Sequence, residues 1–468
     1  MSSSSSSDIV KVVVVGASYA GGAAAQAIAK IQAQGSYKIQ VTLVERRDHF
    51  MHAVGSLHAT VDSKFAPNIF IPIDRIFAAE SGKKDSKDLH DDDHHHVIKQ
   101  GRTLTEVHPH HIVLDDGCKI EFDYLVLATG SSVAAPAKTV SATREDGIIE
   151  LEGYRNAIEQ ATKILIVGGG AVGVELAGEI AAKYNEYGSK SKTSWSDKNK
   201  KEITLVHNGE HLMPGNFGSA LGEDLKRKLE NYGVKVFLKE KLALPQGGND
   251  DNADDSSSTA AATAIKVGSR MNKPVIVKSQ NGTEFETDLI LLAVGNKVNS
   301  GYLKTLYQSS STSGALVDSK TNQILVKDTM QLDDQAFPHI FSVGDVNNYP
   351  YTEKYAFKAG LQGETAAKNI EILIYAGYHT KSKLNSNGRD EANGSALLKN
   401  IKLKAASTFP SNTAMVPIGP YHGSAQLFGF NVTGCIGDFL VKVTKGKDLF
   451  VSKYQKLFGY SGHELATA

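Results

Sequence analysis

The chain has 468 residues, too many for one ordinary core, and at about 150 residues per domain it predicts roughly three domains. Lys and Arg together number 51, as do Asp and Glu, so the chain lacks the basic surplus of a nucleic-acid-binding protein. No apolar run approaches the roughly 18 residues that span a bilayer, and residues 1–7 lack the pattern of a secretory signal. The two cysteines, Cys118 and Cys435, indicate a reducing compartment and favour the cytoplasm.

A strand, turn, helix and second strand open the chain. The β-branched run Ile9–Val15 is typical of a strand buried on both faces of a parallel sheet. The alanine-rich stretch Ala23–Ile31 predicts a helix, and Ile39–Val44 predicts a second parallel strand that ends at Glu45. This succession has the length of a βαβ unit.

The turn of this unit carries a glycine fingerprint for a dinucleotide, made by Gly16, Ser18, Gly21 and Gly22. Gly16 permits the tight turn, Gly21 lets the helix pack on the strand, and Ser18 replaces the usual second glycine with a small residue. The helix N-terminus would bind a pyrophosphate, and Glu45 would accept hydrogen bonds from an adenosine ribose.

The same pattern recurs about 150 residues later in complete form. Lys163–Val167 predicts a strand, Val174–Tyr184 a helix and Glu202–Val206 the next strand, with Gly168, Gly170 and Gly173 in the turn. Two such units in the correct context predict an α/β fold with two Rossmann-like dinucleotide-binding domains.

The second unit differs from the first at the end of its second strand. His207 stands where an Asp or Glu would repel a 2′-phosphate, and no arginine lies nearby to attract one. We therefore expect His207 to contact the nucleotide and to discriminate only loosely between NADH and NADPH.

We expect five segments to be solvated insertions or tails, because they hold too few apolar residues to offset the entropy lost when the chain is ordered. They are residues 1–7, Ser81–His96, Ser189–Lys200, Gln246–Thr259 and Ser309–Ser313. The tract His94–His96 lacks the cysteine pairs or spaced helical histidines of a metal site, so a solvated loop is favoured over adventitious metal binding, and no metal site is expected.

Three more strand ends carry small or acidic residues. Tyr124–Gly130 ends in Thr129 and Gly130, Asp288–Gly295 ends in Gly295, and Ile340–Asp345 ends in Asp345, which could accept hydrogen bonds from ribityl hydroxyls. The stretch Ala356–Ile370 then predicts a helix whose N-terminus faces a flavin.

This order of elements resembles that of the flavoprotein disulfide reductase superfamily, whose members bind two dinucleotides. The segments Asp48–His52, Leu127–Ser131, Val343–Asp345 and above all Leu440–Ser452 narrow the resemblance to the FAD-dependent oxidoreductases that are similar to apoptosis-inducing factor, and within them to the ferroptosis suppressor group. The likeness covers nearly the whole chain apart from the insertions. It implies FAD on Gly16–Glu45 with Thr129, Gly130 and Asp345, and NAD(P)H on Gly168–Gly173.

The resemblance also implies how the chain is divided. We expect a discontinuous FAD-binding domain at residues 8–150 and 300–372, an NAD(P)-binding domain at 151–299 and a C-terminal α+β domain at 373–468.

Further site residues follow from the resemblance. Glu175 would orient the nicotinamide carboxamide beside the flavin, whereas the macrodipole interpretation of an N-terminal helix glutamate fits Glu179 better. Lys354 would lie near the flavin or be a solvated lysine. His58, which falls on a family arginine near the flavin, and Arg102 are also expected to contact a cofactor.

The segment around Leu440–Ser452 is expected to cover the other side of the flavin and to shape a substrate pocket. Lys445 would stabilise an anionic reduced flavin or a quinone oxyanion, and Phe450 would contact the substrate. The alternative is that Lys442, Lys445 and Lys447 form one face of an edge strand.

Cys118 and Cys435 are isolated, so the chain has no redox dithiol beside a flavin, and electrons must pass from the flavin to a quinone, a one-electron acceptor or oxygen. An NAD(P)H:quinone oxidoreductase is favoured. Two alternatives stay open: a reductase of another small acceptor such as monodehydroascorbate or an iron–sulfur carrier, and a redox-gated effector that oxidises NADH slowly and acts by binding a partner.

The stretch Lys453–Tyr460 mixes basic and aromatic residues. It is compatible with peripheral membrane contact, as an apolar quinone would require, and equally with core packing or a frayed tail. The resemblance suggests the mitochondrial outer face or lipid droplets beside the cytoplasm, and it leaves a homodimer open.

Overall fold

The computed structural model describes residues 9–31, 38–78, 96–185, 200–242 except 214 and 216, 268–309, 315–349, 354–387, 401–407, 412–445, 448–461 and 464–465. The five expected surface insertions lie outside these residues except for His96, Lys200 and Ser309 at their ends. Within the described part, no helix combines the length and apolar character needed to cross a membrane.

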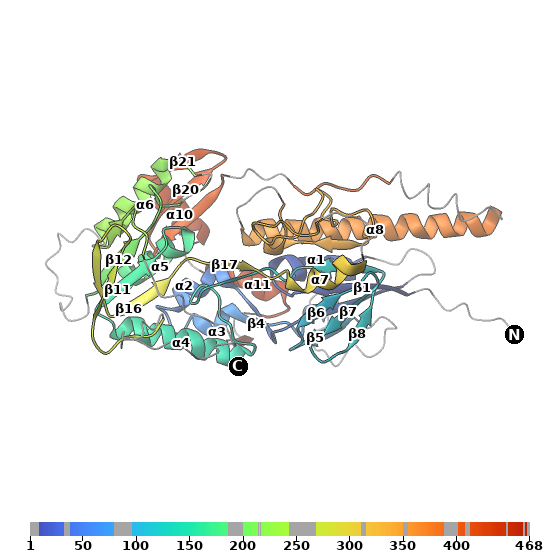
Figure 1. Cartoon of the computed structure of the whole chain (residues 1–468), viewed down its shortest axis with the longest axis horizontal. Helices are drawn as coiled ribbons and strands as arrows, with labels where there is room; N and C mark the ends of the chain where they lie inside the picture. The colour runs from blue at the N-terminus through green and yellow to red at the C-terminus, as the bar shows by residue number, and fades with distance from the viewer. Residues whose placement is uncertain are drawn as a thin grey trace.

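A parallel sheet with the strand order β18-β9-β1-β2-β5 forms the first lobe (Figure 1). Its strands are Ile340–Ser342 (β18), Tyr124–Leu127 (β9), Ile9–Val15 (β1), Lys38–Glu45 (β2) and Val97–Gln100 (β5). In register, Val12 lies between Val41 and Tyr124. Because β18 comes more than 200 residues after β9, this lobe is built from two distant parts of the chain.

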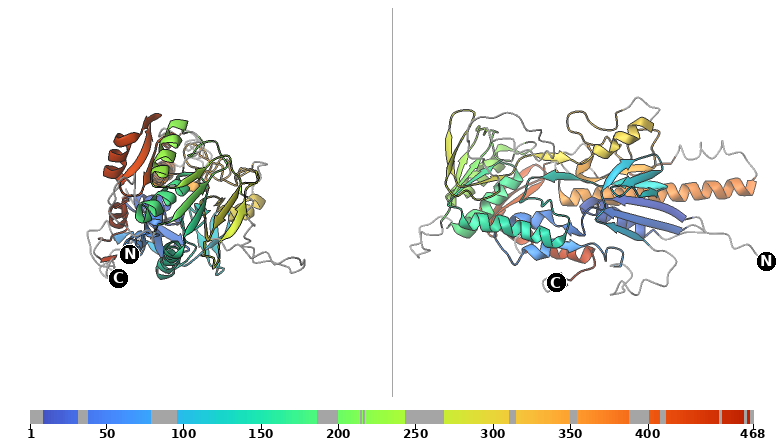
Figure 2. Two further views of the ribbon diagram at one scale, coloured as in Figure 1. Left: turned by 90° about the vertical axis from the view of Figure 1, so that its left-hand side faces the viewer. Right: turned by 60° about the horizontal axis from the view of Figure 1, so that its bottom comes forward.

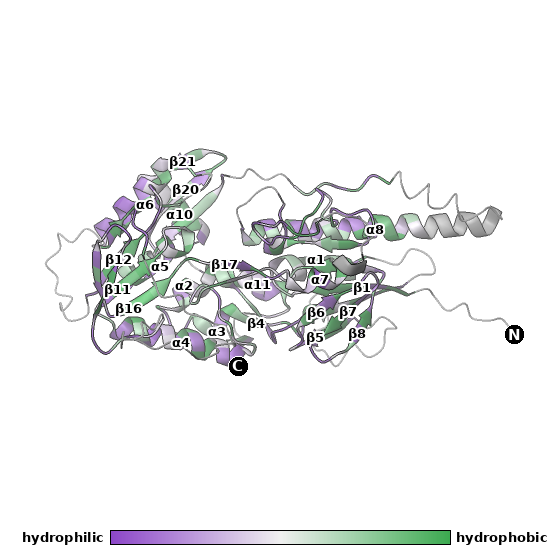
Figure 3. Ribbon diagram, in the orientation of Figure 1, coloured by the Kyte–Doolittle hydropathy of each residue, from purple (hydrophilic) through white to green (hydrophobic). Residues whose placement is uncertain are grey.

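A second parallel sheet with the order β13-β12-β11-β16 forms the other lobe. Its strands are Lys235–Phe237 (β13), Glu202–Val206 (β12), Lys163–Val167 (β11) and Leu289–Leu292 (β16). In Figure 3, β16 is hydrophobic whereas helix α6, Ser219–Asn231, on the outside is mostly hydrophilic. The two parallel sheets confirm the α/β prediction with Rossmann-like units.

Helices α1, Tyr19–Ala29, and α5, Ala171–Tyr184, follow the two glycine turns. Both begin earlier than the apolar pattern predicts, because the turn residues themselves form the first helical turn. Helix α8, Ala356–Asn387, begins where expected but runs well beyond Ile370, and Figures 1 and 2 show it extending past the first lobe. It packs closely on α1, where a Cβ on Gly363 would meet the Ala20 carbonyl oxygen at 2.1 Å.

The remaining elements connect or cover the two sheets. They are β3 His49–Met51, α2 Ser56–Ala59, α3 Ala66–Ile69, β4 Phe70–Pro72, β6 Leu104–Val107, β7 His111–Leu114, β8 Lys119–Glu121, β10 Ser131–Val133, α4 Arg144–Gln160, β14 Val275–Lys278, β15 Glu284–Thr287, β17 Asn296–Val298 and α7 Lys304–Ser309. Strands β10 and β17 pair antiparallel where the chain passes between the lobes.

The C-terminal part is an antiparallel sheet of β19 Ala414–Ile418, β20 His422–Leu427 and β21 Phe430–Val432, followed by α10 Gly434–Lys445 and α11 Val451–Leu457. The edge-strand alternative for the lysines is wrong for Lys442 and Lys445, which lie on helix α10, while Lys447 lies outside the described residues. The pattern misled because the helix keeps its outer face apolar, with Ile436, Phe439 and Val443 exposed.

Helix α11 returns to the first lobe. Its aromatic side chains and those just after it are buried, namely Tyr454, Phe458 and Tyr460. Phe458 stacks on Phe50 with ring centroids 4.7 Å apart. The core-packing interpretation of Lys453–Tyr460 is therefore confirmed for its aromatic residues.

Candidate functional site

A cavity of about 1010 Å³ lies at the carboxyl ends of the first sheet and reaches the second lobe and the C-terminal part. Eleven of the expected site residues line it: Gly16, Ser18, Glu45, Arg102, Thr129, Gly130, Glu175, Asp345, Lys354, Lys445 and Phe450. Residues of four chain regions therefore meet at one cavity, at the sheet edge where ligands of open α/β folds bind.

The first glycine turn is shaped for close approach. Gly16 has φ +102°, and a Cβ there would lie 2.3 Å from the Ala128 carbonyl oxygen. Glu45 holds the turn, because its carboxylate accepts hydrogen bonds from the Ala17 N–H at 2.7 Å and from the Arg47 N–H at 3.1 Å. The turn is thus preorganised, and Glu45 lies at the cavity wall.

Two buried polar atoms on this wall have no partner in the described structure, Nε of Arg47 and Nε2 of His49. Buried polar atoms are normally hydrogen-bonded, so unpaired ones at a cavity indicate a polar ligand. With the glycine cradle and the cavity size, they fit a large cofactor that carries phosphates and hydroxyls, as FAD does. Sequence reasoning missed both residues, which directly follow the acidic strand end.

Asp345 lies in the short 3-10 turn Gly344–Val346 that follows strand β18, where it accepts a hydrogen bond from Ser131 Oγ at 2.9 Å and lies 3.6 Å from Lys138 Nζ. Burial lowers the pKa of the Lys138 ammonium, and the charge of Asp345 opposes this shift. Lys138 is a further wall residue that no sequence pattern marked.

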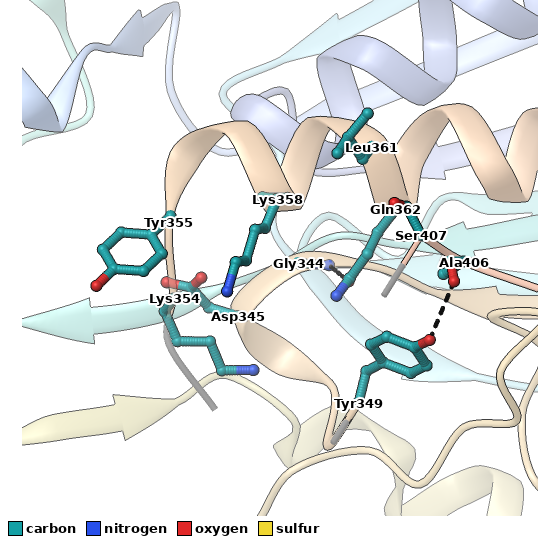
Figure 4. Close-up of a pocket in the computed structure, with 11 residues that line it drawn as sticks. Gly344, Asp345, Tyr349, Lys354, Tyr355, Lys358, Leu361, Gln362, Ala406 and Ser407 are labelled. Atoms are coloured by element: carbon teal, nitrogen blue, oxygen red, sulfur yellow. Dashed lines mark hydrogen bonds between the residues drawn. The ribbon is translucent and has the colours of Figure 1, made fainter. Parts of the chain in front are cut away.

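A small pocket of about 20 Å³ opens beside Asp345 at the first turn of α8 (Figure 4). In this view the Lys358 side chain points toward Asp345, whereas the Lys354 side chain extends away from the carboxylate; Gln362 accepts a hydrogen bond from the Gly344 N–H at 2.7 Å. Lys354 Nζ donates to the Asn347 carbonyl at 2.9 Å, and burial lowers the pKa of its ammonium. Lys354 is therefore half-buried and hydrogen-bonded at the cavity, and its proximity to a flavin stays a prediction.

Thr129 and Gly130 follow strand β9 at the cavity. Thr129 Oγ1 donates to the Asn299 carbonyl at 2.8 Å and lies 2.7 Å from the Tyr302 hydroxyl, which ties the first sheet to the returning chain. Gly130 takes φ +65°. Both backbones therefore face the cavity in a fixed conformation.

The second glycine turn repeats the geometry of the first. A Cβ on Gly173 would lie 1.8 Å from the Gly168 carbonyl oxygen, and a Cβ on Gly21 would lie at the same distance from the Gly16 carbonyl oxygen. His207 Nδ1 accepts a hydrogen bond from the Gly169 N–H at 3.2 Å, as Glu45 accepts one from Ala17. His207 thus takes the structural place in the second unit that Glu45 has in the first.

The other expected cofactor residues do not line the cavity. The second turn, beside the cavity, contains Gly168, Gly170 and Gly173 and is contacted by His207. Gly295 follows β16 with φ +86°. Gly21 and Gly22 lie where helix α1 packs, and a Cβ on Gly22 would lie 3.3 Å from Phe458. The cofactor contacts of these residues stay predictions.

Glu175 and Lys445 form an ion pair at the cavity, with Lys445 Nζ 3.3 Å from Glu175 Oε1. Both side chains are largely buried, at 16% and 15% exposed. Burial raises the pKa of the Glu175 carboxyl, whereas the Lys445 ammonium lowers it in part. The pair joins helix α5 of the second lobe to helix α10, so both residues lie where the sequence prediction needs them.

His58 binds elsewhere than expected, because its Nδ1 lies 2.9 Å from Glu179 Oε2 and the residue does not line the cavity. Burial alone would lower the pKa of His58, but the hydrogen bond and charge of Glu179 raise it overall. Glu179 sits in the middle of helix α5 and therefore does not act on the helix dipole, contrary to the alternative offered for it.

The described residues contain no cluster of three or more metal-ligating side chains. Cys118 is half-buried and Cys435 exposed, and neither lines the cavity. The cavity wall therefore offers polar groups, the ion pairs Glu175–Lys445 and Asp345–Lys138, and apolar side chains, without a thiol.

Comparison with known proteins agrees with this geometry. Residues 10–360 match the family model described as pyridine nucleotide-disulphide oxidoreductase. The chain is 28% identical over 450 residues to apoptosis-inducing factor homolog B of Dictyostelium discoideum, covering 95% of each chain. It is 27% identical over 456 residues to ferroptosis suppressor protein 1 of Taeniopygia guttata, covering 96% of each, and 25% identical over 453 residues to that of Homo sapiens, covering 95% of each.

A solved structure shares the fold. A NAD-dependent persulfide reductase from A. fulgidus superposes with a TM-score of 0.56 at 17% identity, over 89% of this chain and 64% of that chain. The expected cofactors, FAD and NAD(P)H, are those of this family. The chain therefore belongs to the pyridine nucleotide-disulphide oxidoreductase family and is similar over almost its whole length to apoptosis-inducing factor homologs and ferroptosis suppressor proteins.

Proposed function

We propose that this oxidoreductase is an NAD(P)H:quinone oxidoreductase that works without a redox dithiol. The observation that carries the proposal is the single cavity, which runs from the first glycine turn to Glu175 and on to Lys445 and Phe450 with no cysteine on its wall. The cavity offers no pair of thiols that could relay electrons to a disulfide substrate, whereas it suits a flat apolar ring. Similarity to ferroptosis suppressor proteins over 96% of the chain supports the same class.

Much of the cavity wall is apolar and suits such an acceptor. Its apolar side chains come from several elements and include Leu57, Val172, Met213, Met415, Val416 and Phe357. Apolar walls with a few placed polar groups are typical of small-molecule sites. The polar group that the cavity offers here is the Glu175–Lys445 pair.

FAD, when bound, supplies hydride acceptance from NAD(P)H and two-electron delivery to the acceptor. The chain's own residues bind and orient. We propose that Glu175 orients the nicotinamide carboxamide and that the Lys445 ammonium stabilises the negative charge that develops on a quinone oxygen. Glu45, Asp345, Thr129 and Gly130 would bind FAD.

The proposed domain division is supported by the sheet order. Strand β18 joins the first sheet beside β9, as a discontinuous FAD-binding domain at 8–150 and 300–372 requires. The second sheet lies within 151–299, and the antiparallel sheet lies within 373–468.

Anaerobic stopped-flow mixing tests the proposal. The flavoprotein is first reduced with one equivalent of NADH and then mixed with a short-chain ubiquinone, monodehydroascorbate, ferricyanide or oxygen. Fast reoxidation by the quinone in a single two-electron step is expected. Slow reoxidation by the quinone combined with fast reoxidation by another of these acceptors would refute the quinone assignment, and slow reoxidation by all of them would favour an effector that acts by binding a partner.

A further inference from the structure

His52 is completely buried behind the cavity and links three parts of the chain. Its Nε2 lies 2.7 Å from the Leu449 carbonyl oxygen, and its Nδ1 lies 3.0 Å from the Tyr19 hydroxyl. A carbonyl oxygen only accepts, so Nε2 carries the proton and Nδ1 accepts a hydrogen bond from Tyr19. Nothing in the proposed hydride transfer uses His52, although it belongs to the Asp48–His52 segment singled out in the sequence.

The residue that His52 holds lies in a strained turn between helices α10 and α11. Leu449 and Phe450 have φ values of +49° and +67°, so two successive residues with side chains adopt the left-handed conformation. Each such residue is sterically disfavoured because its Cβ crowds the backbone, and it persists only where surrounding contacts enforce it. The turn therefore needs external support.

Two sets of contacts supply that support. Asp448 accepts hydrogen bonds from the N–H groups of Phe450 and Ser452, at 3.1 and 3.2 Å, within the segment itself. From outside, His52 binds the Leu449 carbonyl, and its ring packs on Tyr454 with centroids 4.8 Å apart. Tyr19 also contacts Tyr454, at 5.0 Å between centroids.

The turn matters because Phe450 lines the cavity together with Tyr19 and Tyr454. Leu449 comes directly before Phe450, so fixing the Leu449 carbonyl fixes the direction in which the Phe450 side chain leaves the backbone. We propose that His52 is a positioning residue that holds Phe450 against the acceptor part of the cavity and thereby sets affinity for a quinone-sized ring. This proposal rests on the proposed function only for the identity of the acceptor.

The first test separates the two half-reactions. In His52→Ala, the KM for ubiquinone-1 is expected to rise about tenfold while flavin reduction by NADH stays within about twofold of wild type, because His52 acts only on the acceptor wall. In a Phe450→Ala background, His52→Ala is expected to change the KM no further. An undiminished effect in that background would overturn the proposal.

The second test needs no turnover. Hydrogen–deuterium exchange of the peptide 448–456 is expected to speed up about tenfold in His52→Ala, since the turn loses its external hydrogen bond. Tyr19→Phe, which keeps the ring packing but removes the donor to Nδ1, is expected to give a smaller change in the same direction and serves if His52→Ala does not fold. Unchanged exchange in both variants would overturn the proposal.

Gln26 offers the matched control. Its side chain also ties the C-terminal segment to the first lobe, by donating to the Ile76 and Leu457 carbonyls, but it does not touch the turn. Gln26→Met is expected to lower the melting temperature without changing the KM for ubiquinone-1 or exchange at Leu449 and Phe450. If wild-type enzyme fails to reduce ubiquinone-1, the quinone assignment fails while the exchange experiment still decides the role of His52.

Discussion

Glu175 and Lys445 lie 270 positions apart in the chain and yet pair at 3.3 Å across the cavity. Burial raises the pKa of the Glu175 carboxyl, and the charge of the Lys445 ammonium partly counters that shift. The sequence marked each residue through a family resemblance. Their contact was beyond sequence reasoning, because it depends on helices α5 and α10 both packing on strand β19.

The first prediction concerns Glu175. Glu175→Ala should slow anaerobic flavin reduction by NADH by about tenfold or more while FAD stays bound, because an orienting carboxylate is lost from the cavity. The measurement is flavin bleaching at 450 nm or so in a stopped-flow instrument. Glu159→Ala, which removes a carboxylate on the surface of α4 that pairs with Arg155, is the control and should reduce normally. Unchanged bleaching in Glu175→Ala would remove this residue from the mechanism.

The second prediction concerns pH. Burial lowers the pKa of His52 to about 4; the charge of Asp448 opposes this shift and that of Lys445 adds to it. Burial also lowers the pKa of His49, and Asp48 opposes that shift. Both rings stay neutral in the folded protein while the unfolded chain takes up protons below about pH 6.5. The free energy of unfolding is therefore highest above about pH 6.5 and falls as the pH decreases toward 4. His52 alone accounts for a loss of up to about 3 kcal/mol.

Urea unfolding from pH 7.5 to 4.5 checks this prediction. The double variant His49→Gln, His52→Gln should show a flatter decline of the unfolding free energy with falling pH than the wild type. Parallel curves for the two proteins would show that these histidines do not titrate on unfolding.

At the scale of elements, the glycine turns decide how each helix meets its strand. Gly173 and Gly21 lie so close to the first glycine's carbonyl that any side chain would displace the helix, whereas a Cβ on Gly170 would meet nothing within 4 Å. The role of Gly170 is therefore not packing. We predict instead that its lack of a side chain lets a pyrophosphate approach the backbone closely.

The third prediction separates these two roles. Gly173→Ala should destabilise the protein by several kcal/mol, roughly the range of severe packing errors, because the clash is with backbone. Gly170→Ala should fold with a normal melting temperature and raise the KM for NADH. Calorimetry and steady-state kinetics on the two variants decide the matter; equal melting temperatures would contradict the packing role of Gly173.

At the scale of the whole molecule, a buried lysine connects the second lobe to the C-terminal part. Lys228 of α6 is 1% exposed and lies 3.0 Å from Asp224 and 2.8 Å from Asp438 of α10. It also donates to the Ser424 hydroxyl at 3.1 Å and to the Gly423 carbonyl. Because α10 carries Lys445, this network holds the acceptor wall in place.

The fourth prediction follows from that network. Lys228→Met should destabilise the protein by about 3–5 kcal/mol, since the buried Asp224 and the half-buried Asp438 lose the buried cation that they share. Arg227→Ala, one residue earlier and with a side chain 58% exposed, should lose no more than about 1 kcal/mol although Arg227 also pairs with Asp224. Thermal unfolding measures both. Equal losses of stability in the two variants would show that Lys228 does not hold the second lobe and the C-terminal part together.

The sequence by itself determined the two parallel α/β units, their glycine turns, the acidic strand end Glu45 and the lack of a dithiol, because strand periodicity, turn chemistry and cysteine count are local properties. Only the tertiary structure decided that Lys442 and Lys445 lie on a helix, that His58 binds Glu179, and that Tyr19, His52, Lys138 and Phe450 gather around one cavity. Those contacts join residues up to about 400 positions apart, and long-range packing rather than local propensity fixes them.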